Sequence, residues 1–362
     1  MIIDAVNFYR EKSLIQNQTI EIRNGLISSV VNSSASAATD LLVPGFIDLQ
    51  IYGGGGKLFS AEPTVESLCI MEDDLMKKGT TGFLACMATN SLDVFRACIA
   101  AAKEHRANAR NFLGLHLEGP YMNPKRLGAH IPEFVHKASL DEVKSLLDFG
   151  DGVIRMMTLA PEVQDDDVIN YLLDNDVVVS LGHSDATFDE ATAAYNLGIQ
   201  TTTHLFNAMS PIHHRAPGIP SAVFSHQKAL ASIIADGQHV AFEVLKFAHK
   251  ILKDRLFLIT DAVTPCNIGP YQHIFQENKF VMPDGTLSGS AVTMLQSVKN
   301  CIEYCDIKLP EALQMATYIP AKLIGMEALT GQIALEHQAN LLVLDQQLNI
   351  KKIIFNGIAQ SN

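Results

Sequence analysis

The stretch FLGLHLEGPY, residues 112–121, decides the fold class of this chain. Its first part, Phe112–Leu117, is short and largely apolar, which is typical of a buried strand. The strand is expected to end at Gly119-Pro120, because proline lacks an amide donor and glycine tolerates unusual dihedral angles. Glu118 then lies at the carboxyl end of the strand, where active sites sit in barrels of alternating strands and helices. The alternative for Glu118 alone is a loop carboxylate that hydrogen-bonds nearby backbone, since an unpaired buried carboxylate is costly.

Short apolar runs alternate with amphipathic segments from residue 42 to residue 259. Eight runs are predicted as buried strands: Phe46–Ile51, Gly82–Met87, Phe112–Leu117, Ile154–Leu159, Val177–Leu181, Thr201–His204, Ala231–Ala235 and Leu256–Ile259. Helices are predicted between most of them: Val65–Lys78, Leu92–Glu104, Leu140–Phe149, Asp166–Asn175, Phe188–Leu197 and Ala241–Leu252. This α/β pattern favours a closed (β/α)8 barrel of the TIM type. An open doubly wound sheet is the alternative, but no G-x-G-x-x-G loop opens a helix after the first strand.

Both chain ends are predicted to be β-rich. Predicted strands are Thr19–Ile22, Leu26–Val31, Asn340–Leu344 and Ile350–Phe355; a loop covers Ser33–Thr39, and helices Met294–Cys305 and Pro310–Ile324 precede the last two strands. Asn24-Gly25 is a strong signal for a tight hairpin. Terminal strands need partners to be stable. We therefore expect residues 1–42 and 331–362 to form a small β-sandwich domain beside a catalytic barrel of residues 43–330.

Composition limits the classes of function. The chain has 362 residues, of which 48% are hydrophobic, and its net charge of −12 argues against a broad nucleic-acid surface. No apolar run is long enough to span a membrane, and the start of the chain lacks the pattern of a signal peptide, so a cytoplasmic protein is expected. The six cysteines form no C-x-x-C pair and are predicted to be buried thiols. Cys301 and Cys305 could share a helix face as ligands, but core packing is the preferred interpretation.

Side chains suited to metal binding or acid–base chemistry follow five of the predicted strands. They are Glu118, His183, His204, His239 and Asp261. The Glu/His/His set formed by the first three matches the catalytic zinc pattern of three N or O ligands and one open position. Asp261 is predicted to take a proton from the attacking water and to pass it to the leaving amine. His239 is predicted to donate a hydrogen bond to the developing oxyanion.

Three further histidines lie near these positions. His116 is expected on the same strand face as Glu118. It could be a fourth ligand, but a buried supporting role is preferred. His213 and His214 lie in a loop that contains proline and are predicted as surface or substrate contacts rather than ligands.

Six motifs resemble those of the N-acetylglucosamine-6-phosphate deacetylases, a family within the amidohydrolase superfamily. They are PGFID (44–48), GLHLEGP (114–120), LGHS (181–184), THLFNAM (203–209), IADGQH (234–239) and TDA (260–262). The resemblance covers nearly the whole chain in order. PGFID is general to the superfamily, whereas the LEGP and HLFNAM pair is much more specific.

The resemblance implies roles for matching positions. Glu118, His183 and His204 match metal ligands, Asp261 matches the catalytic acid/base, and His239 matches a histidine that contacts the substrate near its carbonyl. The implied substrate contacts are Gln50, Ala129, His130, Asn207, Ala208, Leu287, Ser288 and Gly289, with His130 on the sugar, Asn207 and Ala208 on the phosphate side, and the last three in a closing loop. Arg215 matches an arginine that reaches the phosphate in the neighbouring subunit, which implies a homodimer. A surface salt bridge is the alternative for Arg215.

The stretch Gln50-Ile51-Tyr52 departs from the family. Many superfamily members carry His-x-His there for a second metal, and single-metal deacetylases resemble Gln-x-Asn. Neither an amide nor a phenol is a good ligand, so one divalent ion per subunit is expected. Zn²⁺ is preferred, with Fe²⁺, Co²⁺ or Mn²⁺ as alternatives. Tyr52 is predicted either to touch the substrate or to pack.

The resemblance implies hydrolysis of N-acetylglucosamine 6-phosphate to glucosamine 6-phosphate and acetate in amino-sugar catabolism. One alternative is the same reaction on another N-acyl sugar phosphate, such as the galactosamine epimer. A second is a deaminase or a dihydropyrimidinase-like ring hydrolase, although the latter usually needs two metals and a bridging lysine, and no predicted strand end carries a lysine. A third is a catalytically inactive sugar-phosphate sensor, against which the intact set of Glu118, His183, His204 and Asp261 argues.

Overall fold

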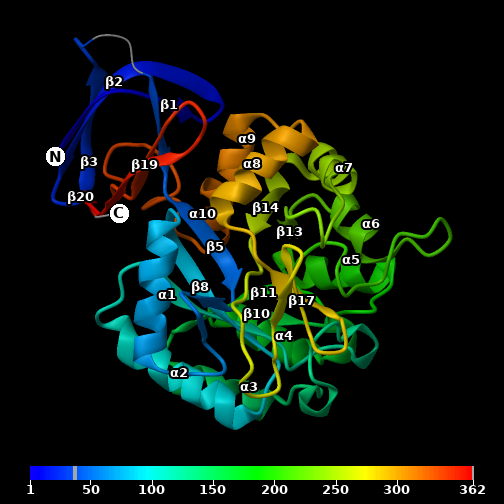
Figure 1. Cartoon of the computed structure of the whole chain (residues 1–362). Helices are drawn as coiled ribbons and strands as arrows, with labels where there is room; N and C mark the ends of the chain where they lie inside the picture. Colours follow the sequence, from blue (N-terminus) through cyan, green and yellow to red (C-terminus); the bar gives the residue numbers. More distant parts are fainter. Residues whose placement is uncertain (36–38, 361–362) are drawn as a thin grey trace.

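The computed structural model describes residues 1–35 and 39–360, and its centre is a sheet of eight parallel strands (Figure 1). In order around the sheet they are β5 (Phe46–Ile51), β8 (Thr80–Ala88), β9 (Phe112–Glu118), β10 (Ile154–Leu159), β11 (Val178–Leu181), β12 (Thr201–Thr202), β13 (Leu230–Ile234) and β14 (Leu256–Ile259). The carboxyl ends of β14 and β5 meet, because Asp261 N donates to Gln50 O and Tyr52 N donates to Ala262 O, both at 2.9 Å. The sheet therefore closes, and the TIM-type barrel expected from the sequence is confirmed.

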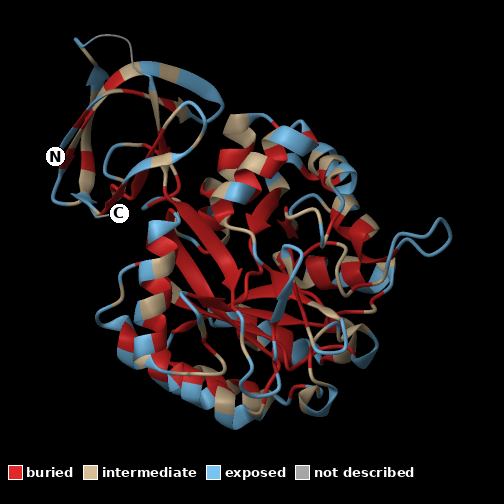
Figure 2. Cartoon of the chain, in the orientation of Figure 1, coloured by how far each residue is buried: buried red, intermediate tan, exposed pale blue. Residues whose placement is uncertain are grey.

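Helices surround the barrel (Figure 1). They are α1 (Val65–Lys77), α2 (Leu92–Arg106), α3 (Leu140–Gly150), α4 (Asp166–Asp174), α5 (Phe188–Leu197), α6 (Gly218–Ser225), α7 (Phe242–Leu252) and α8 (Met294–Cys305). Several begin at a Ser or Thr cap; Thr187 and Glu190, for example, form a reciprocal capping box at α5. Figure 2 shows buried strands, and helices that are buried mainly towards the sheet. None of the helices in the described part of the chain combines the length and apolar character needed to cross a bilayer.

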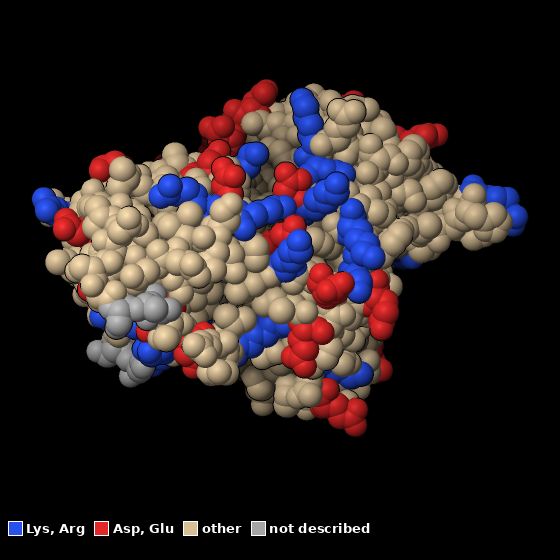
Figure 3. Space-filling model, turned by 90° about the horizontal axis from the view of Figure 1, so that it is seen from above, with Lys and Arg blue, Asp and Glu red and all other residues tan. Residues whose placement is uncertain are grey.

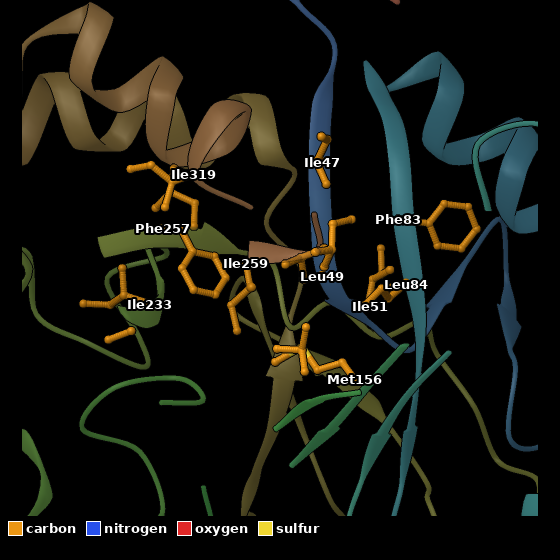
Figure 4. Close-up of a cluster of buried hydrophobic side chains, with 14 of the residues drawn as sticks. Ile47, Leu49, Ile51, Phe83, Leu84, Met156, Ile233, Phe257, Ile259 and Ile319 are labelled. Carbon is orange, nitrogen blue, oxygen red and sulfur yellow. The ribbon is translucent and has the colours of Figure 1, made fainter. Parts of the chain in front are cut away.

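The main core lies within the barrel and between its strands and helices. Figure 4 shows branched, aromatic and thioether side chains from β5, β8, β10, β13 and β14 packed together with Ile319. Phe83, Phe257 and Leu49 in this cluster have no solvent exposure. Burial of such side chains stabilises a fold by about 1.5–3 kcal/mol each relative to exposure. The strands therefore provide a rigid frame for whatever their carboxyl ends carry.

The two chain ends share one mostly antiparallel sheet of seven strands (Figure 1). Its order is β20 (Ile358–Ala359), β19 (Ile350–Phe355), β18 (Leu341–Leu344), β4 (Asp40–Pro44), β1 (Ile2–Arg10), β2 (Ser13–Arg23) and β3 (Leu26–Asn32). Phe8 and Ile20 from one end and Ile354 from the other are fully buried in a common core. The β2–β3 turn also contacts the segment before β18, because Ala339 N donates to Gly25 O (2.7 Å). Part of the loop expected at residues 33–39, namely residues 36–38, lies outside the described residues.

Three expectations about elements are corrected. The helix expected at Pro310–Ile324 is broken at Thr317 into α9 (Leu309–Ala316) and α10 (Tyr318–Leu323). Pro320 explains the break, because a proline inside a helix lacks an amide donor and clashes with the carbonyl four residues earlier. The segment between β14 and α8, where the sequence predicted no strand, contains β15 (Ile274–Gln276), β16 (Lys279–Val281) and β17 (Leu287–Ser290). We call residues 271–290 the flap. Cys69, on the outer side of α1, is exposed and Cys266 is partly exposed, so these two thiols are not buried.

Figure 3 shows the molecule from above, with Lys and Arg side chains gathered in a band beside a hollow. A groove of about 1360 Å³ lies between the β1–β2 turn and helices α5, α6 and α10, with basic side chains including Lys12 and Arg255. These two cations already have partners. Lys12 pairs with Glu311 (3.1 Å), and Arg255 donates to the carbonyl of Ala229 (2.8 Å). None of the site residues expected from the sequence lines this groove.

Candidate active site

A cavity of about 280 Å³ lies at the carboxyl ends of the barrel strands. Of the residues expected in the site, its lining includes Glu118, Ala129, His130, His183, His204, Asn207, Ala208, His239, Asp261, Leu287, Ser288 and Gly289. Gln50 does not line it, but its side-chain amide contacts both Glu118 and Asp261. Arg215 lies away from it. The fold therefore brings nearly all the expected residues together from segments far apart in the sequence.

Left-handed backbone conformations turn three of these side chains at the strand ends. The φ angles are 48° at His183, 32° at His204 and 54° at Asp261. Residues other than glycine rarely adopt positive φ, and such strained positions cluster at functional sites. The conformation at His204 also explains why β12 ends at Thr202, two residues before the strand end expected from the sequence.

Three side-chain atoms converge on one point. His183 Nε2 and His204 Nε2 lie 3.0 Å apart, and they are 3.3 Å and 3.0 Å from Glu118 Oε1. Tetrahedral zinc with N or O ligands at about 2.0–2.2 Å places neighbouring ligand atoms roughly 3.3–3.5 Å apart. The observed separations lie at this range or a few tenths of an ångström below it, so these three atoms are placed to hold one divalent ion in the cavity that they line.

Hydrogen bonds to the backbone determine which histidine nitrogens can bind an ion. His183 Nδ1 faces the carbonyl of Arg126 (2.9 Å), which can only accept, so Nδ1 carries the proton and Nε2 keeps its lone pair. His130 is the opposite case. The amide of Thr89 donates to His130 Nδ1 (3.2 Å), so in the neutral ring Nε2 carries the proton and donates to Glu118 Oε2 (3.2 Å). His130 lies close enough to Glu118 and His183 to share an ion with them, but this tautomer makes it a donor.

His204 has a buried nitrogen without a partner. Among the described residues, no group hydrogen-bonds to His204 Nδ1, whereas its Nε2 faces Glu118 and His183. The polar contacts of the His204 ring are therefore all made by Nε2, which faces Glu118 and His183.

Glu118 is almost completely buried and receives donors on both oxygens. Gln50 Nε2 donates to Oε1 (3.0 Å), and the Tyr52 hydroxyl donates to Oε2 beside His130. Burial alone would raise the pKa of Glu118, but the hydrogen bond from His130 and the contact with the nearby His183 ring lower that pKa well below its usual range. Glu118 is therefore an anion at neutral pH, as a metal ligand must be.

Asp261 has the opposite electrostatic environment. Burial, followed by the neighbouring Glu118 charge, raises the pKa of Asp261 well above its ordinary value. Its Oδ1 accepts from Gln50 Nε2 (2.7 Å), and its Oδ2 lies 4.0 Å from His239 Nε2. His239 Nδ1 in turn contacts Asp236 Oδ2 (2.7 Å). Two carboxylates with pKa values shifted in opposite directions are the usual sign of separate acid–base roles.

His116 lies beneath this group and is not positioned as a ligand. Its Nδ1 donates to the carbonyl of Leu49 (3.0 Å), and its Nε2 contacts the hydroxyl of Thr158 (2.7 Å). Both ring nitrogens are thus used within the barrel, and burial lowers the pKa of His116 to about 3. The geometry supports the buried supporting role.

The sequence did not identify every residue of the cavity wall, and the two missed residues with polar rings are Tyr271 and His273. Both line the cavity from the flap. His273 Nδ1 contacts the hydroxyl of Ser288 (3.0 Å), and the hydroxyl of Tyr271 donates to Thr89 O (2.5 Å), beside the amide that fixes His130. No motif marks this segment. The only signal in the sequence was the alternation of Tyr271 and His273 on one face just before Ile274, which a strand pattern could have revealed.

Arg215 lies in a loop that projects from the barrel between β12 and α6 (Figure 1). Its side chain is exposed, and its guanidinium Nη1 lies 2.8 Å from Nε2 of the neighbouring His214. Within the part of the chain that the structure describes, Arg215 forms no salt bridge. The alternative of a surface salt bridge within the subunit is therefore not supported.

Comparison with known proteins agrees with this geometry. The model of the amidohydrolase family matches residues 41–360. An N-acetylglucosamine-6-phosphate deacetylase from Haemophilus influenzae is 34% identical over 335 residues, covering 89% of this chain and 87% of the relative. An N-acetylgalactosamine-6-phosphate deacetylase from a Shewanella species is 31% identical over 380 residues, covering 99% and 95%.

A solved structure shows the same likeness in three dimensions. The N-acetyl-D-glucosamine-6-phosphate deacetylase of Mycobacterium smegmatis, solved as an alanine mutant in complex with N-acetyl-D-glucosamine-6-phosphate, matches with a TM-score of 0.93 at 29% identity. The match covers 99% of this chain and 98% of that chain, so it includes the small sheet as well as the barrel. The chain therefore belongs to the amidohydrolase family, among the relatives of N-acetylglucosamine-6-phosphate deacetylase.

Proposed function

We propose that this enzyme hydrolyses the acetamide of N-acetylglucosamine 6-phosphate to glucosamine 6-phosphate and acetate, in amino-sugar catabolism. One observation carries the proposal: ligand atoms of Glu118, His183 and His204 converge within 3.0–3.3 Å in the cavity that Asp261 also lines. Relatives with this activity in their names align with most of the chain. A charged sugar phosphate does not cross a bilayer, so enzyme and substrate must share one compartment, for which we propose the cytoplasm.

Glu118, His183 and His204 would hold one divalent ion per subunit, for which we propose Zn²⁺. Fe²⁺, Co²⁺ and Mn²⁺ also accept this mixed oxygen and nitrogen set. When bound, the ion lowers the pKa of a water molecule towards neutrality and polarises the acetamide carbonyl. Gln50 and the backbone carbonyl of Arg126 hold Glu118 and His183 in the orientation that this requires.

Asp261 performs the proton transfers in this proposal. It accepts a proton from the attacking water and returns it to the amine nitrogen as the carbon–nitrogen bond breaks. Its raised pKa, caused by burial and by Glu118, suits a carboxyl group that must hold a proton between these steps. His239 donates from Nε2 to the developing oxyanion. The contact between its Nδ1 and Asp236 Oδ2 (2.7 Å) fixes the orientation of the ring.

The remaining cavity residues would bind the sugar and its phosphate. Ala129, His130, Asn207 and Ala208 come from strand-end loops, and Leu287, Ser288 and Gly289 come from the flap. We propose that Arg215 completes the site from the partner subunit of a homodimer. Its exposed position on a projecting loop supports this role, and its planar guanidinium suits two-point contact with phosphate.

Acetate release with metal analysis tests the function. We expect one divalent ion per subunit and much faster acetate release from N-acetylglucosamine 6-phosphate than from the unphosphorylated sugar. Equal kcat/KM for the two sugars would disprove the phosphate assignment. The galactosamine epimer is the second candidate substrate, because a relative named for it is 31% identical across 99% of this chain. Comparing kcat/KM for the two phosphorylated epimers decides between them.

A ring hydrolase and an inactive sensor are less well supported. No lysine lines the cavity in the described residues, so a bridging lysine of the ring-hydrolase type has no counterpart. A catalytically inactive sensor would bind the sugar phosphate without releasing acetate. The same assay, run beside a binding measurement, separates the sensor from the enzyme.

A further inference from the structure

Tyr52 is the cavity residue whose role neither the family motifs nor the proposed chemistry explains. It follows β5, and its backbone is fixed on both sides: its amide donates to Ala262 O (2.9 Å), and its carbonyl accepts from Phe59 N (3.1 Å). Its ring is buried in a small cluster that includes Val263 and Tyr271. The position of the phenol hydroxyl is therefore set by packing and by backbone bonds, not by a flexible side chain.

The hydroxyl of Tyr52 takes part in a directed chain of hydrogen bonds. The Gln50 amide nitrogen lies 3.2 Å from the phenol oxygen and cannot accept from it, and its two hydrogens are directed to its nearer contacts, Glu118 Oε1 and Asp261 Oδ1. The single hydroxyl hydrogen of Tyr52 is then free for Glu118 Oε2, which it contacts. The same Gln50 amide contacts Glu118 Oε1 (3.0 Å) and Asp261 Oδ1 (2.7 Å). Tyr52 therefore holds Glu118 at Oε2, whereas Gln50 donates to Oε1, the oxygen that also faces His183 and His204.

This arrangement makes the two oxygens of Glu118 unequal. Oε2 is occupied by Tyr52 and by His130 Nε2 (3.2 Å), whereas Oε1 faces the Nε2 atoms of His183 and His204. We propose that Tyr52 is a positioning residue that presents Oε1 alone to the metal ion, so that Glu118 binds the ion through one oxygen. The inference rests on the proposed function only in assuming that a divalent ion is bound.

The variant Tyr52→Phe tests the proposal, because it removes the hydroxyl and keeps the packed ring. We expect divalent-ion affinity, measured by competition with a chelator, to fall roughly ten-fold, as for other groups that support a metal ligand. We also expect the visible absorption of the Co²⁺-loaded protein to change, since Glu118 could then bind with both oxygens. Thermal unfolding of the metal-free proteins checks that the fold is kept.

Tyr271→Phe is the matched control. Tyr271 lines the same cavity and belongs to the same cluster, but its hydroxyl bonds to Thr89 O and not to Glu118. We expect this variant to keep the metal affinity and the Co²⁺ spectrum of the parent protein. An equal loss of metal affinity in both variants would overturn the proposal, because it would indicate a general effect of removing a buried hydroxyl.

Kinetics separate positioning from substrate contact. A positioning role predicts a lower kcat at saturating metal with a nearly unchanged KM for the sugar phosphate. If Tyr52→Phe instead raised KM alone and left the metal affinity and spectrum unchanged, Tyr52 would be a substrate contact and the proposal would be wrong. The metal measurements need no turnover. They therefore decide the role of Tyr52 even if the parent protein releases no acetate, a result that would disprove only the proposed function.

Discussion

The half of the cavity built from strand ends and the half built from the flap are held by different contacts. At the strand ends, His183 is fixed by the carbonyl of Arg126 and His130 by the amide of Thr89. The flap is anchored at its base, where Ser290 N donates to Asp261 O (3.0 Å), but further out Phe275 is 52% exposed. Segments with few buried contacts open more readily than a barrel core.

This difference assigns chemistry and selectivity to different parts of the molecule. Proton transfer and metal binding need atoms held within fractions of an ångström, which the closed barrel provides. Recognition of one sugar needs side chains that can vary without disturbing that frame, and loops provide these. The division predicts large losses of turnover from strand-end substitutions and smaller, substrate-dependent effects from the loops.

The largest effect is expected for Asp261→Asn. The amide cannot accept the water proton, so kcat should fall roughly 10²–10⁴-fold, the range of a general acid–base contribution. The strand-end frame should remain, because the variant keeps an acceptor for Gln50 Nε2. Stopped assays of acetate release, with metal content and substrate binding measured in parallel, check this. Unchanged hydrolysis would show that Asp261 does not carry the proton.

Glu118→Gln and His130→Ala should separate metal binding from sugar binding within one loop. Glu118→Gln removes the anionic ligand, so metal affinity should fall by more than the roughly 10–100-fold seen when a supporting residue is lost. His130→Ala should mainly raise KM, because the protonated Nε2 cannot bind the ion; the loss of its bond to Glu118 Oε2 should lower metal affinity no more than Tyr52→Phe does. Elemental analysis after dialysis, together with KM values, tests the pair. Full metal occupancy in Glu118→Gln, or a metal-free His130→Ala, would contradict the assignment.

The sequence predicted the strand-end half well because its signals are local. The apolar run before Glu118 and the repeated alternation of strands and helices identify the barrel, and a barrel places all strand ends at one face. The tautomers of His130 and His183 could not be predicted, because they depend on Thr89 and Arg126, which lie far along the chain from their partners.

The path of the flap over the strand ends could not be predicted, for a related reason. Tyr271 and His273 reach the cavity only because the flap folds back over the strand ends, and no periodic pattern encodes that path. The break between α9 and α10 shows that a single residue can override a regular pattern, since Pro320 interrupts an otherwise continuous helical signal. Sequence periodicity therefore does not predict where long loops fold in space.

Arg215→Ala should have an intermediate effect that depends on the phosphate. A two-point ionic hydrogen bond contributes about 1.5–3 kcal/mol, so KM for the phosphorylated sugar should rise roughly 10–100-fold. The unphosphorylated sugar should be turned over as by the parent enzyme. Mixing Arg215→Ala with Asp261→Asn, each impaired at a different site, should restore part of the activity if the arginine acts across a homodimer. No recovery in mixed dimers verified by mass would place Arg215 outside the neighbouring site.

The smallest effect is expected for the pH dependence of stability that arises from His273 in the flap. Burial lowers the pKa of His273 to about 4, whereas an unfolded histidine titrates near about 6.5. Below pH 6.5 the unfolded chain binds a proton that the folded flap does not, so stability is lost as pH falls towards 4. Between pH 7.5 and 6 the loss attributable to His273 should be about 1 kcal/mol. Urea unfolding at both pH values, compared with the non-titrating variant His273→Gln, isolates this contribution from those of other buried histidines. If the parent protein and His273→Gln lost equal stability over this interval, His273 would be able to take up its proton in the folded flap, and the flap would have to open to solvent in the native state.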